Sequence, residues 1–193
     1  MEIIKEEKKL IIDDISYKIV ESAAIIIQKE GINALNVSKI LKRLNISNRV
    51  FYNRFNNLEE VLTEVYNRIV VQIREKLNPV YDGKTDFFEY VLTLITNSLE
   101  LSYELKTQLN LYIFGNDSIS EQNYQWYIER IKKLIDYAKD NQLIIDVDSD
   151  VISYTIWCAI RGYNADAVTR MQKDEAIKKI KYSFGLLLEG LKK

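Results

Sequence analysis

The sequence contains no histidine, a single cysteine and a single proline among its 193 residues. Without histidine, the chain cannot form a Ser-His-Asp triad, a Cys-His pair or a histidine-ligated zinc or haem site. The lone cysteine, Cys158, excludes an internal disulfide, which suits a reducing cytoplasm. It lies in an apolar helical pattern, so we expect a small buried side chain rather than a nucleophile. We therefore expect no catalytic residues, no metal and no cofactor.

Glycine and proline together number seven, where average usage would give about 23 in a chain of this length. So few chain breakers leave little room for the turns of a many-stranded sheet, and we expect an all-α fold. No apolar run approaches the roughly 18 residues of a membrane span. Residues 1–7 lack the basic and apolar regions of a secretory signal. We expect a cytoplasmic protein with no membrane partner.

Apolar residues recur at helical spacing along the chain, and this pattern predicts about nine helices. Caps and breaks place the predicted helices at residues 13–30, 37–44, 48–54, 57–77, 86–103, 104–114, 120–141, 149–170 and 174–191. The only proline, Pro79, marks a junction at residues 78–84. We divide the chain into an N-terminal domain, residues 1–56, and a second domain, residues 57–193, whose first helix at 57–77 connects the two.

The net charge of −1 conceals a local bias. Residues 31–58 hold five basic residues and no acidic one, so this stretch carries +5 and the rest of the chain carries −6. An acid-free basic stretch is typical of an element that faces nucleic-acid phosphates. A chance gap in the acidic residues is the alternative explanation.

Residues 37–54 have the pattern of a helix-turn-helix, in which Asn45, Ile46 and Ser47 join two short helices. If Ile46 packs inward, one face of the second helix is free to enter a DNA major groove about 12 Å wide. Arg pairs with guanine and Asn with adenine, while Tyr and Lys bind phosphate. The expected DNA-binding residues are Asn36, Ser38, Lys39, Ser47, Asn48, Arg49, Tyr52, Asn53 and Arg54. A solvated helix in an ordinary bundle is the alternative.

Several short motifs lie in and around this pattern. They are Ala23-Ala24, Glu30-Gly31, Asn36-Val37-Ser38-Lys39-Ile40, the stretch Asn45-Ile46-Ser47-Asn48-Arg49-Val50-Phe51-Tyr52-Asn53-Arg54-Phe55, and Glu59-Glu60-Val61-Leu62. With these motifs, the segment at 15–62 resembles the tetracycline-repressor (TetR) family of bacterial regulators. The remainder of the chain agrees with that family mainly in length and helix order.

The resemblance implies that Tyr52 contacts a phosphate and that the exposed helix face around it reads bases. Two residues depart from the family pattern. Asn45 stands where glycine is usual, and Leu58 stands where a phosphate-contacting lysine is usual. We expect Lys39 or Arg54 to supply compensating phosphate contacts.

The aromatic residues are concentrated in the second half of the chain, where 13 of the 21 lie between Phe87 and Tyr163. Tyr and Trp bury a large ring and keep a polar group, which suits a mostly apolar ligand pocket. The expected pocket residues are Tyr90, Leu94, Tyr103, Tyr112, Trp126, Tyr127, Trp157 and Arg161. Packing in a bundle core is the alternative for each of them.

The last two predicted helices carry small residues at 149–170 and an apolar stripe at 174–191. The expected dimer-interface residues are Ala159, Gly162, Ala165, Ile180, Phe184, Leu187, Leu188 and Leu191. The stripe could instead be intramolecular core. In the TetR family, the two C-terminal helices usually pair with their twofold mates, and such a dimer places two recognition helices about one DNA turn apart.

Together these features predict a ligand-responsive DNA-binding transcriptional regulator, a repressor that a small molecule releases from its operator. Its expected partners are operator DNA, a small-molecule effector and a second copy of the chain. Ligand bound among the central helices is expected to move the helix at 57–77. We expect no enzyme, because adjacent carboxylates such as Glu59-Glu60 lie about 100° apart on a helix and do not converge. The alternative is a helical small-molecule-binding or scaffold protein that does not bind DNA.

Overall fold

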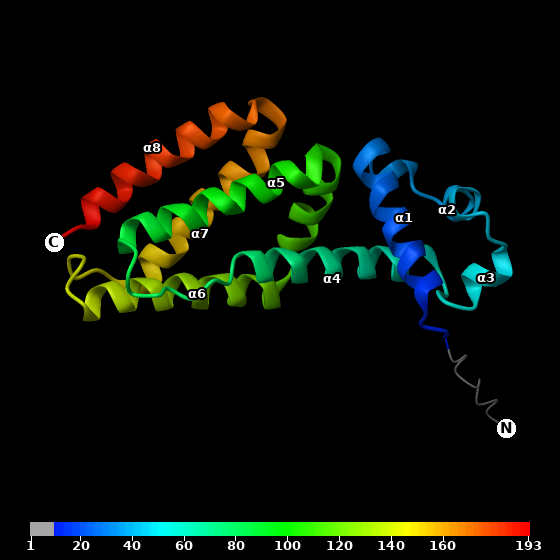
Figure 1. Cartoon of the computed structure of the whole chain (residues 1–193), viewed down its shortest axis with the longest axis horizontal. Helices are drawn as coiled ribbons and strands as arrows, with labels where there is room; N and C mark the ends of the chain where they lie inside the picture. The colour runs from blue at the N-terminus through cyan, green and yellow to red at the C-terminus, as the bar shows by residue number, and fades with distance from the viewer. Residues whose placement is uncertain (1–9) are drawn as a thin grey trace, which may run out of the picture. The chain divides into compact units, whose positions relative to one another are not determined.

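In the computed structural model, residues 10–193 are described, and they form eight α-helices and one short 3-10 helix with no strand among them (Figure 1). The helices are α1 (Asp14–Glu30), η1 (Ile32–Ala34), α2 (Val37–Leu44), α3 (Asn48–Tyr52), α4 (Leu58–Lys76), α5 (Phe87–Asp117), α6 (Glu121–Asp140), α7 (Ser149–Arg170) and α8 (Lys173–Leu191). The all-α prediction is confirmed over this range, and the prediction about residues 1–7 lies outside it. None of the helices in this range is long and apolar enough to cross a bilayer.

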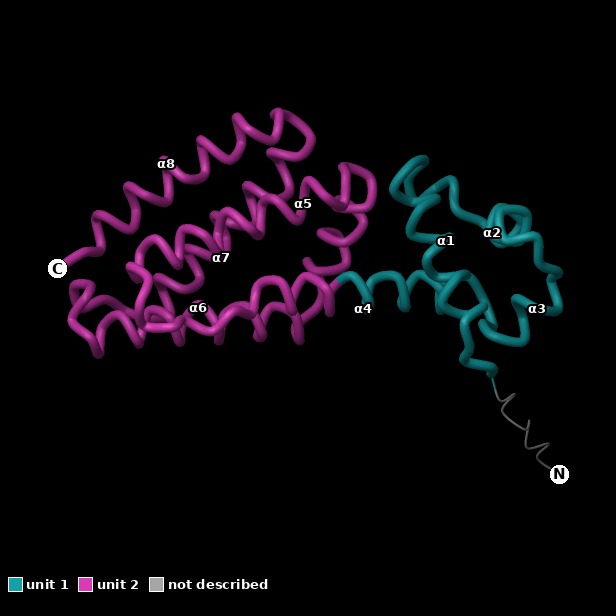
Figure 2. Tube along the Cα trace, viewed as in Figure 1, with its two compact units in different colours: residues 1–69 teal, residues 70–193 magenta. Residues whose placement is uncertain are grey.

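The chain divides into two compact units, Met1–Ile69 and Val70–Lys193 (Figure 2). The division falls within α4, whereas the sequence pattern places it before this helix, at residue 56. The N-terminal half of α4 belongs to the first unit because its Val61 and Val65 are buried. A helix can thus serve as a connecting element and still contribute to a core.

The core of the first unit is built from helix faces at four-residue spacing. Ile19, Ala23 and Ile27 of α1 are almost completely buried, and Ile40 of α2 and Phe51 of α3 are completely buried with them. Burying a side chain of this size contributes about 1.5–3 kcal/mol. This packing stabilises α2 and α3, which are too short to persist as isolated helices.

The second unit is a bundle in which α7 packs against α5, α6 and α8 (Figure 1). Its core draws on all four helices and on the loop after α6. The buried members are Phe87, Ile95, Leu99, Ile135, Ala138, Ile144, Ile156, Ala167, Ala176, Ile180, Phe184 and Leu191. The C-terminus is fastened to the loop after α6, because the Ile145 amide donates to the Leu191 carbonyl at 2.9 Å.

A bend at Lys106 interrupts α5, where the pattern predicts two helices at 86–103 and 104–114. Figure 1 shows the C-terminal part of α5 turning away from the first part. Lys106 has a φ of 60° and a ψ of 162°, a combination that is strained for a residue with a Cβ. A second difference is that α3 ends at Tyr52, two residues before the predicted end.

Replacing Lys106 with glycine should stabilise the second unit by about 1 kcal/mol, because relief of backbone strain exceeds the added entropy of the unfolded chain. The midpoint of urea denaturation measures this change. Lys106→Ala is the matched control, since it removes the exposed side chain and keeps the Cβ. It should alter stability by less than about 0.5 kcal/mol. Equal effects of the two substitutions would show that the bend stores no strain.

Candidate functional site

Local hydrogen bonds and one left-handed residue form the helix-turn-helix. Asn36 begins α2, and its Oδ1 accepts a hydrogen bond from the Lys39 amide at 2.9 Å. Asn45 ends α2 with a φ of 51° and a ψ of 47°, a conformation that asparagine adopts more readily than most residues. Ser47 begins α3, and its hydroxyl accepts a hydrogen bond from the Val50 amide at 3.4 Å. The predicted caps and the predicted break are confirmed.

One face of α3 is buried and the other is exposed. Phe51 is completely buried, and the ring of Tyr52 packs edge-on against it with centroids 5.2 Å apart. Tyr52 itself is 43% exposed. Among the predicted DNA-binding residues, the exposed ones are Asn36, Ser38, Ser47, Asn48, Arg49 and Tyr52. The partly buried ones are Lys39, Asn53 and Arg54.

Two of the five cations between residues 31 and 58 pair with carboxylates. Lys39 Nζ lies 2.6 Å from Glu30 Oε2, and both side chains are exposed enough for solvent to screen the pair. An ion pair of this kind contributes at most about 1 kcal/mol, so Lys39 can exchange Glu30 for a phosphate. Arg54 pairs with Asp13. The other three are exposed and have no carboxylate partner within residues 10–193: Lys42, Arg43 and Arg49.

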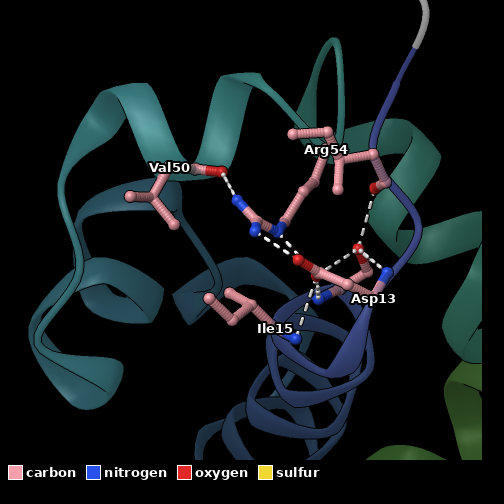
Figure 3. A network of polar contacts seen from close by, with 6 residues as sticks. Asp13, Ile15, Val50 and Arg54 are labelled. Atoms are coloured by element: carbon pink, nitrogen blue, oxygen red, sulfur yellow. Dashed lines mark hydrogen bonds and ion pairs between the residues drawn. The ribbon is translucent and has the colours of Figure 1, made fainter.

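Arg54 fastens the segment after α3 to the start of α1 (Figure 3). Its Nε and Nη2 donate to the two Asp13 carboxylate oxygens at 2.8 and 2.5 Å, and its Nη1 donates to the Val50 carbonyl at 2.8 Å. The Arg54 side chain is only 9% exposed. This geometry conflicts with the predicted phosphate contact of Arg54, because the guanidinium is directed into the unit. Arg54 is a positioning residue for α3.

Asp13 also caps α1. Its Oδ1 accepts hydrogen bonds from the amides of Ile15 and Ser16, each at 3.0 Å (Figure 3). The hydrogen bond from Arg54 holds the pKa of the Asp13 carboxyl well below its usual range. The same contact raises the pKa of Arg54. One carboxylate therefore connects the beginning of α1 to the end of α3.

The second unit contains a mostly apolar cavity of about 150 Å³ among α4, α5, α6, α7 and α8. Five of the eight predicted pocket residues line it: Leu94, Trp126, Tyr127, Trp157 and Arg161. The rings of Tyr127 and Trp157 stack with centroids 4.8 Å apart. Arg161 lies over the Trp157 ring, 4.9 Å from its centroid. The cavity wall is thus aromatic on the α6 and α7 side.

Three of the predicted pocket residues, Tyr90, Tyr103 and Tyr112, are not among the lining residues. The Tyr103 hydroxyl donates to the carbonyls of Ala167 and Met171 at 3.0 and 3.1 Å, which connects α5 to the end of α7. The Tyr90 hydroxyl donates to the Pro79 carbonyl at 2.7 Å. The partly buried Tyr112 ring sits in the last part of α5, where burial raises its pKa. For Tyr90 and Tyr103, the polar group fixes the chain rather than a ligand.

Polar residues that composition does not single out also line the cavity. Ser98 and Asn110 of α5 and Asn164 of α7 are among them. Asn164 Nδ2 donates to Ser98 Oγ at 2.8 Å, and Asn110 Nδ2 donates to the Asn164 carbonyl at 2.9 Å. Asn164 Oδ1 is buried and has no hydrogen-bond partner within the described part of the chain. The only sequence signal for this cluster is a polar residue within an apolar helical pattern, which is too common to be informative.

Four of the predicted dimer-interface residues lie inside the second unit itself. Ile180, Phe184, Leu188 and Leu191 are buried. The apolar stripe of α8 therefore faces its own bundle, which was the alternative explanation. Of the other four, Ala159, Ala165 and Leu187 are partly buried and Gly162 is exposed.

Other side chains form the exposed faces of α7 and α8. On α7 these are Val151, Tyr154 and Cys158, and on α8 they are Tyr182 and Leu186. Cys158 is exposed, so the prediction that it is buried is wrong, because Cys158 lies on the same exposed face of α7 as Tyr154. No group of carboxylate or cysteine side chains suited to holding a metal ion occurs in the described residues.

Residues 19–65, which run from α1 through the helix-turn-helix into α4, match the family model of bacterial regulatory proteins, tetR family. This segment of the chain is therefore similar to the tetR family. No curated protein is significantly similar to the chain. The matched segment includes the capped helix-turn-helix and the exposed face of α3, so the family assignment and the local geometry agree.

Solved structures of other proteins share the fold of this chain. A TetR-family transcriptional regulator from Pectobacterium atrosepticum has a TM-score of 0.76 at 15% identity, covering 93% of this chain and 94% of that one. A regulator of the TetR/AcrR family from Thermobifida fusca YX-ER1 has a TM-score of 0.74 at 22% identity, covering 94% and 100%. A ketosteroid transcriptional regulator from Mycobacterium tuberculosis has a TM-score of 0.66 at 15% identity, covering 97% and 100%. The likeness extends over both units.

The start of α4 differs from the usual tetR-family pattern. Leu58 is the first residue of α4 and is partly buried. Asn57 Oδ1 accepts a hydrogen bond from the Glu60 amide at 2.9 Å, and Glu60 Oε2 accepts one from the Asn56 amide at 2.8 Å. The helix start is therefore capped by an amide and a carboxylate and carries no cation. Any phosphate contact of this tetR-family domain must come from elsewhere.

Asp13→Asn should destabilise the first unit at pH 7. Because folding lowers the pKa of Asp13, its contribution is present above about pH 4, the unfolded value, and is lost as the pH falls below it. The variant should therefore lose less stability than the parent between pH 5 and pH 2, as measured by denaturant unfolding across this range.

Asp14→Asn is the matched control for this experiment, because Asp14 is an exposed neighbour on the first turn of α1. It should leave the stability at pH 7 nearly unchanged and retain the acid sensitivity of the parent. Identical pH profiles for the two variants would contradict the positioning role of the Asp13 carboxylate.

Proposed function

We propose that this protein is a transcriptional regulator that binds operator DNA through the exposed face of α3. The exposed face itself is the observation that carries the proposal. It presents Arg49 and Tyr52, and the preceding helix α2 adds two further exposed cations, Lys42 and Arg43. The opposite face of α3 is buried, and Arg54 is hydrogen-bonded to Asp13, so α3 is held in a fixed position. DNA binding would require the protein to work in the cytoplasm, where bacterial operators are found.

Base recognition and phosphate binding are assigned to different side chains. Arg49 can donate two hydrogen bonds to a guanine edge, and Asn48 can pair with adenine. Tyr52, Ser38 and Lys39 are suited to phosphate oxygens, which set the register without reading sequence. Lys39 takes this role in place of the lysine that the family usually has at the position of Leu58.

We further propose that the active species is a homodimer formed through the exposed faces of α7 and α8. These faces expose Tyr154 at 55%, Tyr182 at 72% and Leu186 at 59%. Large apolar side chains at this level of exposure on neighbouring helices are typical of a protein interface. A twofold dimer would give the regulator two recognition helices for the two halves of an operator.

Regulation is proposed to run through α4. Ile73 and Leu77 at its C-terminal end line the cavity. Arg74 stacks over the Trp126 ring, 5.2 Å from its centroid, and donates a hydrogen bond to Asn123. A ligand in the cavity therefore contacts the same helix whose first half packs in the DNA-binding unit. Its binding would shift the population of α4 positions and release the repressor from DNA.

The cavity supports a second candidate function on its own, that of a small-molecule-binding protein without DNA contact. The two candidates differ in one measurable property, which is binding to the DNA upstream of the protein's own gene. Ligand binding without any DNA affinity would favour the second candidate.

Arg49→Ala should relax the sequence preference of DNA binding, with a loss of about 1–3 kcal/mol on the preferred operator and a smaller loss on unrelated DNA. Tyr52→Phe should weaken binding to all sequences by a similar factor, because it removes a phosphate contact. Fluorescence anisotropy with selected and scrambled duplexes measures both effects. Arg170→Ala, which removes an exposed cation from α7, should leave both affinities unchanged. If Arg49→Ala and Tyr52→Phe also bind like the parent, α3 is not the reading helix.

Leu186→Arg should convert the dimer into monomers, because it places a charge at the centre of the proposed α7–α8 interface. Sedimentation equilibrium measures the change, which should exceed tenfold in the dimer dissociation constant. Val80→Arg is the matched control, since Val80 is an exposed apolar residue in the loop before α5. A monomeric parent protein, or an equally dimeric Leu186→Arg variant, would exclude this interface.

A further inference from the structure

We infer that the cavity of the second unit binds a neutral, mostly apolar molecule of about the size of a substituted benzene, which carries one hydrogen-bond donor directed at Asn164 Oδ1. The inference names the chemical class of the effector and so rests on the ligand response proposed above. The inference rests on three properties of the cavity. They are its size and apolar walls, a buried acceptor without a hydrogen-bond partner among the described residues, and the contacts that its charged side chains already make within the unit.

The size and the walls of the cavity set the body of the ligand. The volume is about 150 Å³, and an apolar cavity of about 150 Å³ in another protein holds a benzene molecule. Most of the lining is aliphatic or aromatic, including Leu94, Phe114 and Trp157. A compact apolar body, such as an aromatic ring, is the group that gains most from such walls.

The unpaired acceptor sets the polar group of the ligand. The Asn164 amide is oriented by its Nδ2, which donates to Ser98 Oγ at 2.8 Å. The backbone carbonyl of Asn164 is occupied by Asn110 Nδ2 at 2.9 Å. This leaves Oδ1 of Asn164, a residue that lines the cavity, as a buried oxygen without a hydrogen-bond partner among residues 10–193. A buried acceptor without a hydrogen bond is unfavourable, so a ligand O–H or N–H gains affinity by donating to it.

The charged residues of the lining are already engaged within the unit. Arg161 Nη2 donates to Ser118 Oγ at 2.6 Å, and the guanidinium lies over the Phe114 and Trp157 rings at 4.4 and 4.9 Å from their centroids. The Asp117 carboxylate accepts a hydrogen bond from Asn123 Nδ2. The charged groups of the lining are two arginines and one carboxylate, so a ligand ion of either sign would meet a group of its own sign.

The second arginine of the lining is engaged in the same way. Arg130 donates to Asn78 Oδ1 at 2.5 Å and to the Pro79 carbonyl at 2.9 Å. Its guanidinium also lies 5.9 Å from the centroid of the Trp126 ring. A neutral ligand is the one that leaves all of these contacts in place.

Four probes of nearly equal size test the inference: phenol, toluene, anisole and benzoate. They offer, in order, a donor, no polar group, an acceptor alone, and an anion. Binding to the full-length protein is followed by tryptophan fluorescence, because Trp126 and Trp157 line the cavity, and is checked by ligand-observed NMR. The experiment contains no DNA, so its outcome is separate from the outcome of the operator-binding test.

The decisive variant is Asn164→Leu, which removes the amide at nearly constant volume. Phenol should bind it about tenfold more weakly than it binds the parent, which is the worth of one hydrogen bond to a buried acceptor. Toluene should bind the variant at least as tightly as the parent. Ser102→Ala is the matched control, since Ser102 also lines the cavity but its hydroxyl donates to the Ser98 carbonyl and not to Asn164. This variant should retain phenol binding within about threefold.

The parent protein gives an independent test that does not depend on folding of the variant. Phenol should bind the parent at least fivefold more tightly than anisole does, because anisole cannot donate. Tighter binding of benzoate than of phenol would overturn the inference in favour of an anionic ligand. Equal losses of phenol and toluene on Asn164→Leu, or no binding of any probe, would also overturn it. Operator binding that persists in the last case would leave the DNA-binding proposal intact.

Discussion

The bidentate pair between Arg54 and Asp13 is the contact on which the geometry of the first unit depends. A helix of five residues, such as α3, cannot persist by its own hydrogen bonds. Burial of Phe51 holds α3 against the core, but a single ring leaves rotation about its contact possible. The guanidinium of Arg54, which bonds Asp13 and the Val50 carbonyl together, removes that freedom. Because Asp13 also caps α1, the first and third helices share one fixed point.

The second unit, in contrast to the first, contains several features that lower its stability. These features are an apolar cavity and the strained backbone of Lys106 at the bend of α5. The side-chain oxygens of Ser153 and Asn164 are also buried without a hydrogen-bond partner among residues 10–193. Ser153 and Asn164 both lie on α7, the helix that packs against α5, α6 and α8. Departures from ideal packing that gather around one helix are expected where a protein must accept a ligand or move.

Signals that act within a few residues could be predicted from the sequence. The caps at Asn36 and Ser47 and the break at Asn45 are local, and all three occur as predicted. Tertiary pairing could not be predicted, since Arg49 and Arg54 are the same residue type five positions apart. One is exposed and the other is bonded to Asp13, 41 residues away in the sequence. The difference arises only when α1 and α3 pack together.

The contrast between local signals and tertiary contacts also explains which predictions for the second unit agree with the structure. Trp126, Tyr127 and Trp157 are predicted as pocket residues because aromatic residues are concentrated in this half of the chain, and all three line the cavity. Tyr90 and Tyr103 are predicted on the same grounds and do not line it, and their hydroxyls bond to backbone carbonyls that lie elsewhere in the sequence. An apolar stripe on α8 is compatible with an internal or an external partner, and periodicity alone does not separate the two. Asn164 gives no sequence signal, because its role depends on which atom remains unpaired after folding.

The ion pairs of Lys39 with Glu30 and of Arg54 with Asp13 affect how the proposed DNA complex responds to ionic strength. Each phosphate that a cation neutralises releases condensed counterions, so the binding constant falls with salt by an exponent of about 0.9 per contact. Five cations in the basic stretch would give a steep dependence. Arg54 is withdrawn by Asp13, and the contribution of Lys39 is reduced because it must first leave Glu30, so fewer than five cations set the response. The complex should then tolerate a rise in intracellular potassium better than the charge of its sequence suggests.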